Sequence, residues 1–306
     1  MLNPTISVVI PAYNAERWIG ETLVSVLTQT LPPMEIIVVD DGSTDGTSSL
    51  VQRYGSQVRY LYQENQGAGA ARNAGMRAAS GQYIAFVDAD DLWKPEKLAL
   101  QVDKITQGYD WVICDYICFD DATYQPVKMP RLYLYEGDVL EKLFQVNFIG
   151  SPTPVVKREI FERVGVFDAS SSARIGEDWE MWLRIAAKYP LGVVRQKLAY
   201  RRIHASSLMA STDVYRKLDN LTYIIESSAA REPARLMKIK PRALANKRYG
   251  FGVALFNAER FTEAKPLFVD VLRSRPFHFG AMAYLAVLIS GPSSSKSILR
   301  LKRRLF

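Results

Sequence analysis

Cysteine is scarce in this sequence, with only Cys114 and Cys118 among 306 residues. So few cysteines exclude a disulfide framework and a four-cysteine zinc site, and they favour a reducing compartment. Long apolar runs are also missing. The stretch Ala281–Ile289 has nine residues, whereas a membrane-spanning helix needs about 20. The N-terminus has no basic segment followed by a long apolar one, so a secretory signal is not expected. These absences predict a cytoplasmic location.

Acidic residues are scarce towards the C-terminal end. Residues 231–306 hold 16 Lys and Arg against 4 Asp and Glu, a balance of +12, and residues 1–230 hold 23 against 28. Such an asymmetry indicates an anionic partner for the basic end, either nucleic acid or a membrane surface. The composition is otherwise globular, with 48% hydrophobic residues. A chain of 306 residues fits one large domain with an accessory segment, or two modest domains.

Apolar, strand-like runs alternate with helical patterns through the first hundred residues. Strands are predicted at 6–11, 35–39, 58–62 and 83–87, and helices at 16–29, 44–54, 68–79 and 95–106. Nearly continuous apolar strands that alternate with helices of this length predict an α/β fold of parallel β-α-β units, covered on both faces of the sheet. In such folds the chemistry gathers at the carboxyl ends of the strands.

Acidic residues follow two of these strands. Asp40 and Asp41 come after the second strand, and Asp88, Asp90 and Asp91 come after the fourth. A polar turn is the simpler interpretation for Asp41-Gly-Ser. It does not explain five carboxylates at one edge, because like charges raise the energy of the fold unless a cation lies among them. Asp88-Ala-Asp90 after an apolar strand therefore predicts a site for Mg²⁺ or Mn²⁺, which prefer hard oxygen ligands.

Two other patterns receive structural interpretations. Gly67-Ala-Gly-Ala-Ala-Arg72 resembles the start of a dinucleotide fingerprint, but it follows the third strand and has Arg72 in place of the third glycine. A Rossmann dehydrogenase is therefore not expected. Cys114 and Cys118 lie four residues apart in the strand-like stretch 111–119. This spacing puts both on one face, and we expect them to pack in the core.

Four motifs stand in order along this part of the chain, and together they resemble a known family. They are Ser7-Val-Val-Ile-Pro-Ala-Tyr-Asn14, Val38-Val-Asp-Asp-Gly-Ser-Thr-Asp45, Asn65-Gln-Gly67 with Ala71-Arg-Asn-Ala-Gly75, and Phe86-Val-Asp-Ala-Asp-Asp91. The order and spacing are similar to those of family 2 glycosyltransferases with the GT-A fold, densely over about residues 5–120 and thinly to about 210. The resemblance implies a mostly parallel, Rossmann-like sheet flanked by helices. It also implies transfer of a sugar from a nucleotide diphosphate sugar, with inversion at the anomeric carbon.

The resemblance further implies where the donor binds. By position, Pro11, Ala12 and Tyr13 would flank the nucleobase, and Asp41 would hydrogen-bond to it. Arg72 would face the diphosphate or a carboxylate of the donor site. The full set of implied nucleotide-sugar contacts is Pro11, Ala12, Tyr13, Asn14, Asp40, Asp41, Arg72, Asp88 and Ala89. The implied metal, Mn²⁺ or Mg²⁺, would bind Asp90 as its main ligand, with Asp88 and His204.

A second acidic motif, Gly176-Glu-Asp-Trp-Glu-Met-Trp182, is similar to the acceptor-side Glu-Asp of the family. The resemblance implies that Asp178 is the catalytic base, with Glu177 as a weaker candidate. Direct inversion needs one carboxylate to take the proton of the attacking acceptor hydroxyl. A helix is also predicted to begin here, so an acid favoured by the helix dipole is the competing interpretation. For His204, a surface position competes with the metal role.

The C-terminal residues are predicted to form a basic helical tail, 231–306, after a catalytic domain at 1–230. Within the tail, Gly, Ala, Phe and Pro at intervals over 245–278 resemble one tetratricopeptide repeat. A single repeat does not bury its own face, so we expect it to pack on the catalytic domain or on another subunit. Residues 296–306 mix five basic residues with apolar ones. No nucleic-acid-binding fold accompanies them, so an anionic membrane surface is the favoured partner.

These observations favour one function over two alternatives. The favoured function is a metal-assisted, inverting hexosyltransferase that moves a sugar from a UDP-sugar to a glycan or lipid-linked acceptor, in the synthesis of cell-envelope polysaccharides at the inner face of the membrane. A nucleotidyltransferase of similar fold is the first alternative, but the loop 12–17 is not the Gly-rich, basic loop of those enzymes. The second is a non-catalytic scaffold that binds sugar nucleotides, which the repeat-like tail suggests and the acidic motifs oppose.

Overall fold

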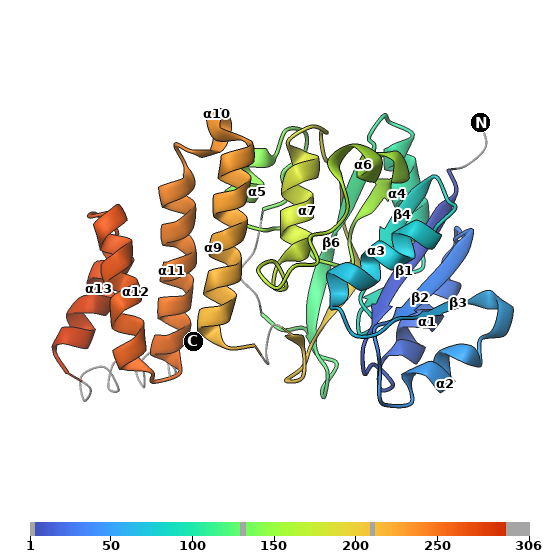
Figure 1. The fold of residues 1–306 in the computed structure, drawn as a ribbon, viewed down its shortest axis with the longest axis horizontal. Coiled ribbons are helices and arrows are strands. Elements are labelled where there is room, and N and C mark those ends of the chain that lie inside the picture. The colour runs from blue at the N-terminus through green and yellow to red at the C-terminus, as the bar shows by residue number, and fades with distance from the viewer. Residues whose placement is uncertain (1–3, 129–132, 209–211, 292–306) are drawn as a thin grey trace. The chain divides into compact units, whose positions relative to one another are not determined.

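The computed structural model describes residues 4–128, 133–208 and 212–291 (Figure 1). The chain divides into two compact units. The first consists of Met1–Leu143 with Asn147–Ser211, and the second of Phe144–Val146 with Thr212–Phe306. The domain limits predicted from the sequence stay a prediction. Position 230 lies inside helix α9 (Val214–Arg231), and the division in the structure comes before that helix.

The first unit is built on an eight-stranded sheet with the order β3-β2-β1-β4-β7-β6-β8-β5. Its strands are β1 (Ile6–Ala12), β2 (Glu35–Asp40), β3 (Arg59–Tyr62), β4 (Tyr83–Phe86), β5 (Leu92–Trp93), β6 (Trp111–Asp120), β7 (Val155–Lys157) and β8 (Gly192–Ile203). Strands β1 to β4 pair in parallel, as the sequence predicts. The sheet as a whole is mixed, because β7 is antiparallel to both β4 and β6, and β5 is antiparallel to β8.

Helices cover both faces of this sheet. They are α1 (Ile19–Leu27), α2 (Thr47–Gln52), α3 (Ala68–Ala78), α4 (Lys97–Ile105), α6 (Arg158–Val164) and α7 (Glu177–Ala186). A further short helix, α5 (Leu140–Gln145), begins in the first unit and ends in residues assigned to the second. The predicted alternation in the first hundred residues is therefore confirmed, with helices shorter at their ends. The mostly parallel sheet flanked by helices is the GT-A arrangement that the sequence predicts.

Alternate residues of each strand pack on opposite sides of the sheet. Val8 and Ile10 join the core on the side of α1, α2 and α4. On the other side, Phe86 contacts Phe167 and Trp182, at ring-centroid distances of 5.4 and 6.1 Å. The predicted core position of the two cysteines is confirmed, since Cys114 and Cys118 are both buried.

The second unit is helical in its described part. Besides α9 it contains α10 (Pro233–Leu236), α11 (Lys240–Asn257), α12 (Phe261–Ser274) and α13 (Phe279–Ile289). Apolar side chains of α11, α12 and α13 form one core cluster, which includes Phe256, Phe268 and Ala281. The predicted C-terminal helical region is thus confirmed, while the tetratricopeptide repeat at 245–278 stays a prediction. Among the described residues, no helix combines the length and the apolar character needed to cross a membrane. Residues 296–306 lie outside the described ranges.

Candidate functional site

The carboxyl ends of β1 and β2 lie side by side and carry the first group of predicted residues. Ala12 pairs with Asp40 in the parallel register, and the backbone N–H of Asp41 donates to the carbonyl oxygen of Ala12 at 2.8 Å. Pro11 and Ala12 are buried within β1, whereas Tyr13 just beyond it is 54% exposed. Tyr13 therefore presents an accessible aromatic ring at the edge where the sequence places the nucleobase.

Asp40 and Asp41 are buried and satisfied by hydrogen bonds within the protein. The two oxygens of Asp40 accept from the N–H of Ser43 and the hydroxyl of Tyr60, at 2.8 and 2.7 Å. One oxygen of Asp41 accepts from the side chain of Gln63 and the N–H of Gln66, and the other from the N–H of Gly67. Gly67 itself has a φ of 91°, in the region that glycine adopts without the strain a side chain would cause. The two carboxylates therefore fix the loops after β2 and β3.

Asn14 joins the loops that follow β1 and β2. Its own backbone has a φ of 48°, in the left-handed region that asparagine tolerates better than most residues. Its N–H donates to the hydroxyl of Ser43 at 2.9 Å, and its side-chain oxygen accepts from the N–H of Thr44 at 2.8 Å. The two loops beside Tyr13 are therefore held to one another by direct hydrogen bonds.

Three carboxylates gather after β4. The ligand oxygens of Asp88, Asp90 and Asp91 all lie within 4.8 Å of one another. Burial raises the pKa of Asp91 well above its ordinary value, and the charges of Asp90 and Asp88 raise it further. Hard oxygen ligands at this spacing fit a divalent cation. Of the five carboxylates that the sequence brings to this edge, only these three form the group, because Asp40 and Asp41 are satisfied elsewhere.

His204 contacts this carboxylate group. Its Nε2 lies 2.8 Å from Oδ2 of Asp90, and its Nδ1 lies 2.9 Å from the hydroxyl of Ser206. The indole of Trp18 lies against the imidazole, with 4.2 Å between ring centroids. Only 8% of the His204 side chain is exposed, so the surface position considered for this residue does not describe it. The structure thus brings His204 beside the three carboxylates, where the sequence predicts it as a metal ligand, and that role stays a prediction.

Arg202 ties the carboxylate loop to the rest of the unit. Its N–H donates to Oδ1 of Asp91, and its Nε donates to the carbonyl oxygen of Asp90, both at 2.8 Å. The other guanidinium nitrogens donate to Asp121 and Glu21, at 3.0 and 2.7 Å. The side chain is fully buried. Asp121 also accepts from the indole N–H of Trp18, so a single network reaches Asp90, Asp91 and the ring that packs on His204.

Arg72, on α3, bridges two acidic residues from different elements. It donates to Oδ1 of Asp88 and to Oε1 of Glu177, each at 2.6 Å. Burial disfavours its positive charge, but Asp88, Glu177 and Asp178 outweigh that effect and raise the pKa of Arg72. The resemblance implies that Arg72 faces the diphosphate or a carboxylate of the donor site. In the structure it contacts the carboxylates of Asp88 and Glu177. Arg72 thereby connects the loop after β4 with the first turn of α7.

Glu177 and Asp178 begin α7, directly after Gly176, which has a φ of 92°. Burial raises the pKa of Glu177 to about 7 against the opposing effect of Arg72. Burial likewise raises the pKa of Asp178, whose Oδ1 accepts from the N–H of Trp179. Asp178 is only partly buried, whereas Glu177 is buried. Of the two acids, Asp178 is therefore the one with a surface open to a substrate, and Glu177 is committed to Arg72.

Several of these residues have no assigned role in the sequence interpretation. Arg202 stands in the segment Tyr200-Arg-Arg-Ile-His204, where nothing in the pattern distinguishes it from a surface cation on a strand. Trp18 and Asp121 belong to no motif. The one available signal is the pair of arginines shortly before His204, because a buried strand tolerates a charged residue only where a partner neutralises it.

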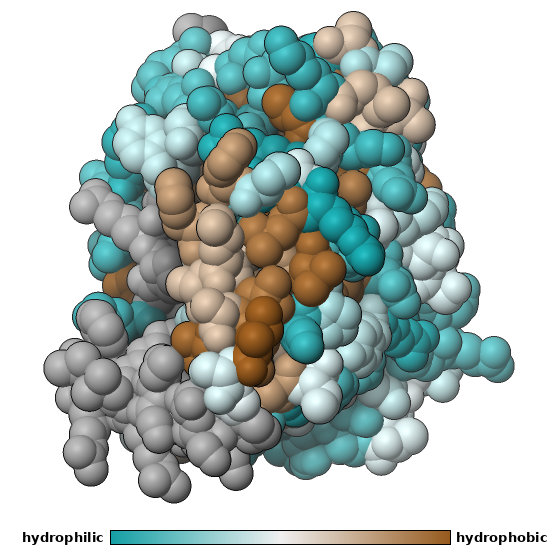
Figure 2. Space-filling view, turned by 90° about the vertical axis from the view of Figure 1, so that its left-hand side faces the viewer, coloured by the Kyte–Doolittle hydropathy of each residue, from teal (hydrophilic) through white to brown (hydrophobic). Residues whose placement is uncertain are grey.

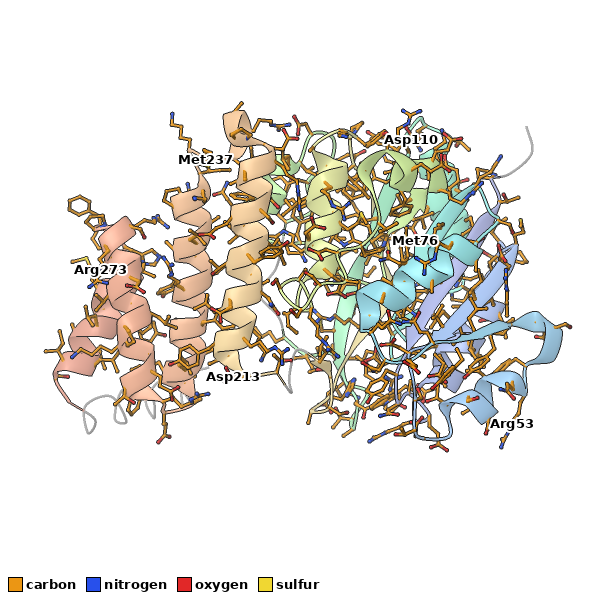
Figure 3. The ribbon with its side chains drawn as sticks, viewed as in Figure 1. Arg53, Met76, Asp110, Asp213, Met237 and Arg273 are labelled. Carbon is orange, nitrogen blue, oxygen red and sulfur yellow. The ribbon has the colours of Figure 1, made fainter. Side chains whose placement is uncertain are left out.

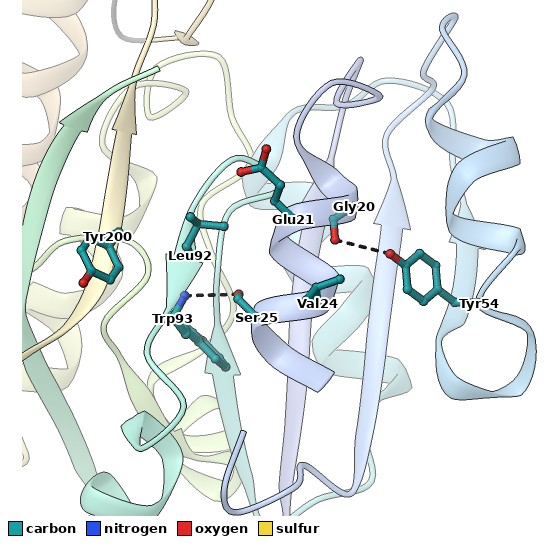
Figure 4. A pocket seen from close by; sticks show the side chains of 8 residues that line it. All are labelled: Gly20, Glu21, Val24, Ser25, Tyr54, Leu92, Trp93 and Tyr200. Carbon is teal, nitrogen blue, oxygen red and sulfur yellow. Dashed lines mark hydrogen bonds between the residues drawn. The ribbon is translucent and has the colours of Figure 1, made fainter. Parts of the chain in front are cut away.

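A separate pocket of about 500 Å³ lies beside α1 (Figure 4). It is lined by Gly20, Glu21, Val24, Ser25, Tyr54, Leu92, Trp93 and Tyr200. The N–H of Trp93 donates to the hydroxyl of Ser25, and the hydroxyl of Tyr54 donates to the carbonyl oxygen of Gly20. None of the predicted site residues lines it. Its one carboxylate, Glu21, is engaged by Arg202.

A family model described as Glycosyl transferase family 2 matches residues 7–165 of the chain. This range contains β1 to β4 and the three-carboxylate group, and it ends before α7 and β8. The four motifs from which the resemblance was drawn therefore all lie inside the matched residues.

Similar proteins cover the chain to different extents. A Bacillus subtilis protein, "Putative teichuronic acid biosynthesis glycosyltransferase TuaG", is 30% identical over 72% of this chain and 91% of its own length. An "Uncharacterized glycosyltransferase" from Rickettsia felis is 33% identical, but this chain spans only 33% of that protein. Among solved structures, TarS 1-349 of S. aureus in complex with UDP-GlcNAc has a TM-score of 0.63 and 20% identity, over 97% of this chain and 92% of the other. This last similarity shows the shared fold.

Proposed function

This chain belongs to glycosyl transferase family 2, and from that premise we propose that it transfers a hexose from a UDP-sugar to a glycan or a lipid-linked acceptor, with inversion. The observation that carries the proposal is the bridge made by Arg72. It joins the carboxylate group after β4 to the acidic turn that begins α7. Donor chemistry and acceptor chemistry need to lie side by side in a transferase, and this bridge joins the residues proposed for each.

The donor is assigned to the carboxyl edge of β1, β2 and β4. Tyr13 packs on the nucleobase, and the loops held by Asn14, Asp40 and Asp41 shape the pocket around it. Pro11 and Ala12 form the floor, and Ala89 lies beside the sugar. The TarS structure with UDP-GlcNAc supports a uridine nucleotide, because that protein has the same fold. Asp41 already accepts three hydrogen bonds from the loop after β3. It therefore acts on the nucleobase mainly by holding that loop in place beside it.

The metal is assigned to Asp88, Asp90 and His204, with Asp91 behind them. A bound Mn²⁺ or Mg²⁺ would neutralise the charge that develops on the leaving diphosphate. Asp88 is held by Arg72, and Asp90 is in contact with His204. Both residues are thus oriented by partners before any ligand binds.

Asp178 is assigned as the base that takes the proton of the acceptor hydroxyl. A carboxylate whose pKa is raised by burial is a stronger base than one in water, which suits this step. Glu177 is assigned a positioning role through its pair with Arg72. The acceptor class is supported by the TuaG similarity, since that protein is described as acting in teichuronic acid biosynthesis.

We also place the enzyme in the cytoplasm, peripherally on the inner face of the membrane. The support is the charge of the C-terminal end: residues 296–306 hold five basic residues and no acidic ones. A lipid-linked acceptor would be reached most directly from such a position. The same region would allow an oligomer to form through the helical tail, whereas nucleic acid is not a proposed partner.

The test begins with binding. We expect UDP or a UDP-sugar to raise the melting temperature with Mn²⁺ present and much less with EDTA, and we expect Asp90→Ala to remove the metal-dependent part. Asp103→Ala, an exposed aspartate on α4, is the matched control and should behave as wild type. Equal stabilisation with and without metal in the wild-type protein, as well as in Asp90→Ala, would contradict the metal assignment. The anomeric configuration of a transferred sugar, read by NMR, tests inversion.

A further inference from the structure

Residues 277–291 contain no Asp, Glu, Lys or Arg. They include α13, the last helix in the described part of the chain. One side of α13 packs inward. Ala281 is buried, and Tyr284, Leu285 and Leu288 are partly buried against the cluster formed with α11 and α12. These inward residues follow the spacing of three and four that one face of a helix requires.

The opposite side of α13 is also apolar, and it is exposed. Its exposed residues Phe279, Met282, Ala283, Ala286 and Ile289 again follow a spacing of three and four. Phe279 is 80% exposed, and Phe277, in the turn before the helix, is 85% exposed. Figure 2 shows hydrophobic residues gathered on the face of the molecule where α12 and α13 lie. A helix that is apolar all round is normally buried on all sides, so this face needs a partner.

The charge of the flanking chain distinguishes between partners. Residues 271–306 hold seven Lys and Arg and no Asp or Glu. A second copy of the chain would carry the same basic sequence, and like charges oppose the association of two such chains. An anionic lipid surface offers apolar chains to the phenylalanines and negative headgroups to the basic residues. Within the described part of this basic segment, the side chain of Arg273 on α12 is 76% exposed and pairs with Asp270.

We propose that the outer face of α13, with Phe277 and Phe279, is a membrane-contact surface that inserts into the headgroup boundary of an anionic bilayer. The inference rests on the proposed peripheral location, and it assigns the apolar part of that contact to described residues. Exposed aromatic side chains at a turn are suited to the interface, because their rings enter the boundary without needing a polar partner. The basic residues supply attraction at longer range, about 1 kcal/mol for each residue near the surface.

The test is co-sedimentation of the full chain with vesicles of phosphatidylcholine and phosphatidylglycerol. Phe277→Ser/Phe279→Ser should lower the vesicle partition constant by about tenfold or more at physiological salt, because the buried apolar area is lost. Deletion of 296–306 should weaken binding mainly at low salt and on anionic vesicles. Met237→Ser is the matched control: it removes an exposed apolar side chain of the same unit, from the turn after α10 and away from Arg273 (Figure 3).

Each other outcome identifies a different partner or none. Equal vesicle binding by wild type and the double variant would overturn the proposal. So would a wild-type chain that ignores vesicles but forms a dimer, which the double variant abolishes in sedimentation velocity. UDP-sugar stabilisation with Mn²⁺ is measured on the same samples and should be unchanged in all of them. Loss of vesicle binding with normal donor binding separates this surface from the proposed transfer reaction.

Discussion

Arg72 and Glu177 form a buried ion pair with 2.6 Å between Nη1 and Oε1, although they are 105 positions apart in the chain. The pair brings α7 to the carboxylate loop after β4, because Arg72 also holds Asp88. Arg72 therefore contacts both a residue proposed for the donor site and the turn that holds the proposed base.

Removing this arginine should leave two carboxylates without their partner. We expect Arg72→Met to lower the free energy of unfolding by about 3–5 kcal/mol, the usual effect of breaking a buried ion pair. Adding Glu177→Gln removes one unpaired charge, so the double variant should recover part of that loss. Urea unfolding measures both. A double variant no more stable than Arg72→Met would show that Glu177 carries no unpaired charge in the single variant.

Asp178→Asn should separate binding from turnover. The side chain keeps its size and loses its ability to take a proton, so donor affinity should stay near normal while turnover falls about 10²–10⁴-fold. The raised pKa of Asp178 further predicts that wild-type turnover declines as pH falls through a value above the ordinary one for aspartate. A variant with more than half of wild-type turnover would leave Asp178 as a residue of the first turn of α7, favoured there by the helix dipole.

We expect Arg202→Lys to weaken metal binding, although Arg202 is not one of the proposed metal ligands. Lysine does not reproduce the bonds from the guanidinium to Asp90, Asp121 and Glu21, so the carboxylate loop loses its support. We expect the affinity for Mn²⁺ in the presence of UDP to fall about 10–100-fold, the range found for residues that orient metal ligands. Isothermal titration calorimetry measures it.

The matched control for this experiment is Arg184→Lys. Arg184 is also held by several partners, namely Glu180 and the carbonyl oxygens of Val164 and Val166. That change should alter stability while the Mn²⁺ affinity stays at the wild-type value. If both lysine variants weaken Mn²⁺ binding equally, Arg202 has no particular connection to the metal loop.

Lys97 should make stability depend on pH. Its side chain is fully buried, its Nζ donates to Gln101 at 2.6 Å, and burial lowers its pKa from 10.5 to about 8. Between these values the unfolded chain binds more protons than the folded one, so the free energy of unfolding rises with pH. The rise should be roughly 1 kcal/mol between pH 8 and 9 and absent in Lys97→Met.

Cys114 provides the comparison for Lys97. Burial raises the pKa of its thiol from 9 to about 11, so this group contributes stability that is lost as pH rises through that range. Its effect is opposite in sign, sets in as pH approaches 9 and is largest between pH 9 and 11, mostly above the window used for Lys97. Cys114→Ala should therefore keep the rise between pH 8 and 9 and make it slightly larger. Chemical denaturation at closely spaced pH values distinguishes the two groups.

The sequence predicts the parallel half of the sheet well, and the antiparallel half poorly. Runs such as Val8 to Pro11 are apolar at successive positions, and a helix follows each run at short range. In contrast, β7 has three residues and β5 has two, which is too short for any periodic pattern. Their pairing depends on distant partners, as in Trp93 with Ala199.

The same distinction applies to the site. The motif order indicates Asp88, Asp90 and His204, because each stands at a strand end or in a motif of the family. Arg202 is not distinguished in this way. Its partners Glu21, Asp121 and Asp91 lie 181, 81 and 111 positions away. Local patterns hold no information about contacts at such separations, which the fold alone creates.

The placement of Arg202 on β8 also fixes the order in which a growing chain acquires its parts. Strands β1 to β4 leave the ribosome first and are able to pair at once. A further 111 residues must then be synthesised before Arg202 is available to donate its N–H to Asp91 in the carboxylate loop. At a synthesis rate of about 5–20 residues per second, the wait lasts roughly 6 to 20 seconds. A nascent chain that is released early, before β8, therefore carries the parallel strands β1 to β4 and an acidic loop that has not yet received its support.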